Sequence, residues 1–213
     1  LLSFVAVSLT KLPSEVIPEN PSWLNGLILL LRKLVVSRPT SAGRAAYTQS
    51  AAALLQAFPR QTPLLLLDSK STKKMGDDES KPFTYLFINL LLIDIRSAYP
   101  SLLPKLNSAE YPAISKRLAA AFDVVSSFIG FLIRSLDDED GEFIMPPDLL
   151  LKLRKDIAET ISLTAEYLRD RFDASIAGTL GLDKDAVGGP ATYGGTRKQL
   201  TFDSIKDDIP HDQ

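Results

Sequence analysis

The stretch PFTYLFINLLLIDIRSA, residues 82–98, constrains the fold more than any other part of the chain. It is apolar almost all round, but Asn89 and Asp94 interrupt it, so it is too short and too polar for a comfortable membrane span. A helix with apolar residues on every side has to be covered by other helices of the same molecule. We therefore expect a buried central helix that ends before Pro100, and no integral membrane segment.

Proline and capping residues mark the other helices. Asn20 is a typical N-cap residue, and Pro21 suits the first position of a helix. Pro39 ends that helix, because proline disfavours helical geometry in the residue before it, and Thr40 or Ser41 caps the next helix. The sequence predicts helices over residues 1–10, 20–38, 41–58, 82–99, 112–136 and 147–172, and one or two helical turns over residues 61–67.

The two longest predicted helices each carry an apolar stripe at helical spacing. In residues 112–136 the stripe consists of Ile114, Leu118, Phe122, Val125, Ile129, Leu132 and Leu136, and it is widened by Val124, Phe128 and Phe131. In residues 147–172 it consists of Leu149, Leu153, Ile157, Ile161, Ala165, Leu168 and Phe172. We expect Leu153, Ile157 and Ile161 to be deeply buried against the helix formed by residues 114–136.

The arrangement of these helices indicates an all-α fold. No segment alternates apolar and polar residues between hairpin turns, so a sheet is not expected. Five or six helices with short connections at prolines favour armadillo/HEAT-like stacked helix pairs, a short α-solenoid. A compact helical bundle is the alternative, because the chain has no clean repeat of about 40 residues.

The same pattern predicts the domain organisation. We expect residues 1–182 to form a single α-helical, armadillo-like domain that is a fragment of a longer solenoid. Residues 183–213 are expected to form a flexible or loosely docked tail, because glycines and charges outnumber its isolated apolar residues. Residues 68–80, DSKSTKKMGDDES, are polar and without periodicity, which predicts an exposed loop.

Charge and cysteine content exclude several classes of protein. The 24 Lys and Arg residues are balanced by 26 Asp and Glu residues, so the basic excess of a nucleic-acid-binding protein is missing. There is no cysteine, which removes disulfides, thiol nucleophiles and the common zinc sites. The one Asn-x-Ser triplet starts at Asn20 and is excluded as a glycosylation site by its central proline. Both features suit a reducing compartment, and we expect a cytoplasmic protein.

Three groups of residues suggest chemistry but lack what that chemistry needs. The acidic stretch 137–142 would place Leu136 and Pro147 at the first and twelfth positions of a calcium loop, where neither can be a ligand. His211 lies in the polar tail, where no packed neighbour would hold a catalytic base. The glycine pairs at 188–189 and 194–195 are not followed by the Lys-Ser/Thr of a phosphate loop. We expect no catalytic residue, no cofactor-binding residue, no metal ligand and no cofactor.

Asn89 and Asp94 are the better candidates for a specific role, because both lie within apolar surroundings. Buried carboxylates are sometimes catalytic but more often bind a backbone group or an arginine. Arg96 and Arg134 are plausible partners of Asp94. The second hypothesis for this chain is accordingly an enzyme with a carboxylate-based pocket between helices near Asp94.

Three stretches together resemble the neurochondrin family, in particular its fungal members. They are SRPTSAGRAAYTQSAAALLQAFP at 37–59, PFTYLFINLLLIDIRS at 82–97 and MPPDLLLKLRKDIAETISLTAEYLRDRFDASIAG at 145–178. The resemblance is one of general pattern and contains no catalytic signature. It implies an α-helical armadillo-type protein. Animal members are cytoplasmic proteins that bind signalling and trafficking partners.

The leading hypothesis is a non-enzymatic scaffold or adaptor that presents helix faces to a partner protein of unknown identity. A peripheral membrane-associated trafficking factor is a third hypothesis. The first helix carries Leu1, Phe4 and Val7 and no polar face suited to a capping repeat. We therefore expect it to expose apolar surface and to favour self-association.

Overall fold

The computed structural model describes residues 1–37, 39–67, 81–106, 108–137 and 145–177. All regular secondary structure in these residues is helical, and none of them lies in a β-strand. The all-α fold class predicted from the sequence is therefore confirmed.

The chain divides into two compact units. Unit 1 contains Leu1–Leu92 and Ala120–Asp156, and unit 2 contains Ile93–Ala119 and the residues from Ile157 onward. The predicted loop at 68–80, the predicted tail, its glycine pairs and His211 lie outside the described residues. The prediction of one domain over residues 1–182 is not tested by this division and stays a prediction.

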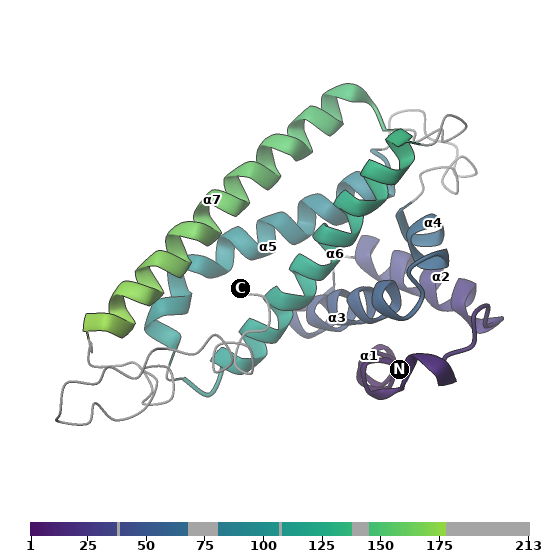
Figure 1. Ribbon diagram of the computed structural model, residues 1–213, viewed down its shortest axis with the longest axis horizontal. Coiled ribbons are helices and arrows are strands. Elements are labelled where there is room, and N and C mark those ends of the chain that lie inside the picture. Colours follow the sequence, from purple (N-terminus) through teal and green to yellow (C-terminus); the bar gives the residue numbers. More distant parts are fainter. Residues whose placement is uncertain (38, 68–80, 107, 138–144, 178–213) are drawn as a thin grey trace. The chain divides into compact units, whose positions relative to one another are not determined.

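Four α-helices and one 3₁₀ turn begin unit 1 (Figure 1). They are α1 (Leu2–Lys11), η1 (Ser14–Val16), α2 (Trp23–Val36), α3 (Ser41–Ala57) and α4 (Gln61–Leu67). Helix α1 packs on α3, and α2 packs on both α3 and α4. These pairwise contacts fit stacked helices, whereas the choice between an armadillo/HEAT solenoid and a bundle stays a prediction.

The predicted helix starts are right for α3 and early for α2. Thr40 caps α3, because its hydroxyl accepts a hydrogen bond from the backbone N–H of Gly43 at 3.3 Å. Helix α2 starts at Trp23, after Ser22 rather than after Asn20. The N–H of Leu24 donates to the carbonyl of Pro21, so a tight turn precedes the helix.

Small residues allow α1 to approach α3 closely. Ala6 on α1 and Ala51 on α3 are both buried, and neither has a side chain that would hold the helices apart. The hydroxyl of Ser50 donates to the carbonyl of Leu2 at 2.9 Å. The same hydroxyl lies 2.7 Å from the carbonyl oxygen of Ala46 on its own helix, so it links the first turn of α1 to α3.

Three long helices contribute residues to both units. They are α5 (Phe83–Lys105), α6 (Tyr111–Asp137) and α7 (Pro147–Ala177). The expectation that the central helix ends before Pro100 was wrong, because α5 continues through Pro100 and Pro104. Leu102, which lies between these prolines, is buried. The free energy gained by burying it offsets the free energy lost with the helical hydrogen bonds that the prolines remove.

The buried face of α6 is centred on the residues that were expected only to widen it. Val124 and Phe128 are fully buried, whereas Phe122 and Ile129 of the predicted stripe are half-buried. Leu118 and Val125 of the predicted stripe are buried as well, so the packed face overlaps the predicted stripe and is shifted toward Val124 and Phe128.

Two of the described helices, Phe83–Lys105 and Tyr111–Ser135, are long and apolar enough to cross a bilayer by length and composition alone. Core helices of soluble proteins pass the same test, so this finding is weak evidence for a membrane span. The expectation of no integral membrane segment stays a prediction.

Candidate functional site

Asp94, the residue singled out from the sequence, forms an ion pair within unit 2. Its Oδ2 lies 3.3 Å from Nε of Arg117, which comes from α6. Both side chains are mostly buried, at 15% and 17% exposure. Nε itself is buried and has no aligned hydrogen bond, so the contact is ionic rather than a hydrogen bond.

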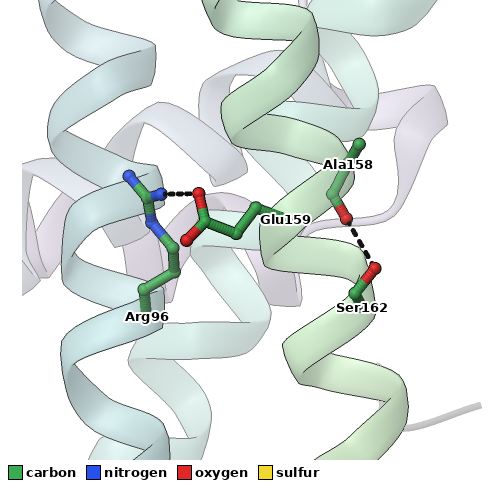
Figure 2. Close-up of polar contacts among 4 residues, drawn as sticks. All are labelled: Arg96, Ala158, Glu159 and Ser162. Carbon is green, nitrogen blue, oxygen red and sulfur yellow. Dashed lines mark hydrogen bonds and ion pairs between the residues drawn. The ribbon is translucent and has the colours of Figure 1, made fainter.

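Neither of the predicted partners of Asp94 was right. Arg96 lies two residues further along α5, about 200° around the helix axis, and therefore points away from Asp94. It pairs with Glu159 of α7, with Nη1 and Oε2 2.7 Å apart (Figure 2). Arg134 is exposed and belongs to unit 1.

Pairs of hydroxyl groups form further polar contacts between α7 and the other two helices of unit 2. The hydroxyls of Tyr99 on α5 and Thr164 on α7 lie 2.7 Å apart, and those of Tyr111 on α6 and Tyr167 on α7 lie 3.1 Å apart. The rings of Tyr99 and Tyr167 are also in contact, with centroids 5.3 Å apart. We call the whole set the polar seam: Asp94, Arg96, Tyr99, Tyr111, Arg117, Glu159, Thr164 and Tyr167.

The polar seam is suited to holding α5, α6 and α7 together within unit 2 and is poorly suited to catalysis or metal binding. The carboxylate of Asp94 is held against a guanidinium and is only 15% exposed, so little of it is accessible to a substrate. No group of three or more His, Asp or Glu residues in the described parts of the chain is placed to hold a metal ion. Asn89 is half-buried in unit 1 and does not join the seam. Of the acidic stretch 137–142, only the first residue is described.

The polar seam fixes the rotation of α7 about its own axis. Leu153, Thr160 and Tyr167 recur every seven residues and are all buried. The expectation that Ile161 is deeply buried was wrong, because its side chain is 56% exposed. Ile157 is half-buried, and only Leu153 of the three residues is buried as predicted.

The result is an apolar stripe on the outside of α7 within unit 2. Phe172 is 55% exposed, much like Ile161, while Ala165 is exposed and Leu168 half-buried. We call this set the α7 outer stripe: Ile157, Ile161, Ala165, Leu168 and Phe172. Next to it, the hydroxyl of Ser162 donates to the carbonyl of Ala158 at 3.0 Å, on the side of α7 away from Arg96 (Figure 2).

Comparison with known proteins identifies the family. The family model described as Neurochondrin matches residues 1–208, nearly the whole chain. The chain belongs to the neurochondrin family. No curated protein and no solved structure matches it. The resemblance seen in the sequence is thereby confirmed, whereas the likeness to fungal members stays a prediction.

Membership of the neurochondrin family bears on the function in general terms. Neurochondrin is not known as an enzyme family, and membership points to an interaction role. The sequence did not reveal the polar seam, because its hydroxyl and charge partners lie on different helices. The one available signal was the heptad spacing of Leu153, Thr160 and Tyr167.

Proposed function

We propose that this member of the neurochondrin family is a non-enzymatic, cytoplasmic scaffold or adaptor that binds a partner protein. The partner would dock an apolar helix or groove on the α7 outer stripe. The observation that carries this proposal is the exposure of Ile161 and Phe172, two large apolar side chains on one face of a single helix.

The polar seam supports this proposal, because it keeps the stripe exposed. Rotating α7 by about 100° would bury Ile161 but would separate Glu159 from Arg96 and Thr164 from Tyr99. Losing these contacts costs free energy, more for the part-buried hydroxyl pair than for the ion pair, because the side chain of Glu159 is 53% exposed. The helix therefore keeps its apolar side available to another molecule.

The side of α7 next to the stripe supplies a charge for a polar rim. Arg169 is 66% exposed and lies about 60° around the helix from Phe172. Protein interfaces commonly combine an apolar centre with such a charged, solvent-accessible border. Placement in the cytoplasm rests on the absence of cysteine from the chain.

Affinity purification of the protein, followed by mass spectrometry, tests the proposal. A true partner should be captured by the wild-type chain and lost with the double variant Ile161→Glu, Phe172→Glu. The control is Leu64→Glu, which places the same charge at an exposed apolar position of α4 and should leave capture unchanged. Purified partner should then bind the purified chain with the same dependence on these variants. Equal capture by all three proteins would refute the proposed surface.

A further inference from the structure

One side of α2 is exposed along the whole helix and is almost entirely apolar. It lies opposite the buried stripe that includes Leu24, Ile28 and Leu31. Its four large apolar side chains are between 43% and 59% exposed. We call it the α2 outer face, and it consists of Trp23, Gly26, Leu29, Leu30, Lys33 and Val36.

Nothing in the described parts of the chain explains why residue 26, in the middle of this face, is glycine. A Cβ atom built on Gly26 would meet no atom of the described residues within 4 Å, and its φ does not lie in the left-handed region. A glycine inside a helix makes the folded chain less stable than an alanine would. Glycine on a helix surface does, however, allow another backbone to approach closely. Gly26 is therefore explained if a second helix crosses α2 at this point.

We propose that the second helix is α2 of another copy of this chain, and that the two copies cross at Gly26 about a two-fold axis. In an antiparallel crossing of this kind, residues equally far from Gly26 in opposite directions meet. Leu29 of one copy then packs on Trp23 of the other. Lys33 of each copy lies toward the segment that precedes α2 in the other copy, and this segment contains the exposed acidic residue Glu19, four positions before the helix starts.

Charge favours this symmetric pairing. Helix α2 contains no acidic residue, so its Lys33 has no opposite charge on its own helix. The two Lys33 side chains lie seven residues on either side of the crossing, about 21 Å apart along the axis. This separation is more than twice the screening length of about 8 Å in physiological salt, so the repulsion between the two lysines is small. Two Lys33–Glu19 pairs remain as the attractive charge contacts.

A membrane surface fits the α2 outer face less well. Membrane-bound helices gain affinity from apolar area and from flanking basic residues. Gly26 adds no area, and the basic neighbour Arg32 is directed into unit 1. Its Nη1 donates to the carbonyl of Leu65 at 3.1 Å, and its guanidinium lies 4.5 Å from the ring centre of Phe83.

Sedimentation velocity over a concentration range on the order of 1 µM to 1 mM tests the proposal. The wild-type chain should show a monomer–dimer equilibrium, and Leu29→Glu should be monomeric throughout. Gly26→Ala should weaken dimerisation by about tenfold or more, while raising the melting temperature measured at a concentration where the chain is monomeric. A variant that folds more stably but dimerises more weakly would show that Gly26 serves the contact between the two copies and not the fold of one copy.

A control variant and a charge swap test whether dimerisation depends on the α2 outer face. Gly130→Ala adds a Cβ whose nearest contact is an ordinary 3.5 Å to Nη1 of Arg134, so it should leave dimerisation unchanged. Lys33→Glu and Glu19→Lys should each weaken the dimer, and the double variant should restore it.

The proposal is overturned by a chain that is monomeric at every concentration, or by dimerisation that Gly26→Ala leaves intact. Association that survives Leu29→Glu but is lost in Phe4→Glu would assign self-association to α1 instead. A monomer that floats with phosphatidylserine–phosphatidylcholine vesicles, and loses flotation with Leu29→Glu, would assign the face to a membrane.

Discussion

Oδ2 of Asp94 lies 3.3 Å from Nε of Arg117, and each of these mostly buried charges depends on the other. Asp94→Asn removes the negative charge and leaves the guanidinium without its ion-pair partner. We expect the free energy of unfolding to fall by about 1–3 kcal/mol, less than for a fully buried pair because some solvent reaches both groups. Urea denaturation monitored by circular dichroism measures this loss.

The matched control for this change is Asp170→Asn, which removes a charge from the surface pair between Asp170 and Arg169. That change should alter stability by less than about 0.5 kcal/mol. If the two variants are equally stable, the Asp94–Arg117 contact makes no specific contribution to the fold.

Leu153 and Ile161 lie on the same helix and are expected to respond very differently to truncation. Leu153→Ala should reduce the free energy of unfolding by about 2–5 kcal/mol, because its side chain is fully buried. Ile161→Ala should reduce it by less than about 0.5 kcal/mol, because more than half of its side chain is exposed. A large loss in both variants would mean that the α7 outer stripe is buried in solution.

These two residues also show how far the sequence predicts the structure. The prediction followed apolar residues in steps of four, and each such step moves about 40° around the helix. From Leu153 to Ile161 the stripe therefore turns by about 80°, away from the buried face. That face continues instead through Thr160 and Tyr167, whose burial depends on partners in other helices.

The start of α3, the helical character of the chain and the position of Asp94 in apolar surroundings were accessible from local patterns. Thr40, for example, caps α3 through a bond to a residue three positions away. The pairing of Asp94 with Arg117 was not accessible, because it depends on how α5 and α6 pack. The exposure of Ile161 depends in the same way on the polar seam.

Pro100 lies inside α5, where it removes a helical hydrogen bond and crowds the preceding turn. Its side chain is exposed, so alanine would lose little packing there. We expect Pro100→Ala to raise the free energy of unfolding by about 1–2 kcal/mol, after allowing for the greater freedom of the unfolded chain. Thermal and urea denaturation both measure this gain.

Pro112 provides the control, because it is exposed and lies in the first turn of α6, where a backbone N–H has no helical partner. Pro112→Ala should therefore give no gain in stability. A loss of stability in Pro100→Ala would show that α5 needs the proline for its path.

Glu110 and Lys105 form an exposed pair with Nζ and Oε2 2.9 Å apart. The hydrogen bond from Lys105 and its positive charge lower the pKa of Glu110 below its ordinary value. A carboxylate with a lowered pKa stabilises the folded state above the unfolded pKa, and this effect is lost as the pH falls through the folded pKa. Titration of Glu110 by NMR should show a lowered pKa that returns to normal in Lys105→Gln. An identical pKa in both proteins would contradict the contact.

The most direct test of the account is site-specific photo-crosslinking of the protein in its own cells. A photoreactive phenylalanine analogue replaces Ile161, Phe172 or, as a control, the exposed residue Glu166, which lies about 120° around the helix from Phe172. We expect the same protein to be crosslinked from positions 161 and 172, and much less of it from position 166. Absence of a crosslinked protein at positions 161 and 172, or equal crosslinking from all three positions, would contradict a scaffold that binds its partner through the α7 outer stripe.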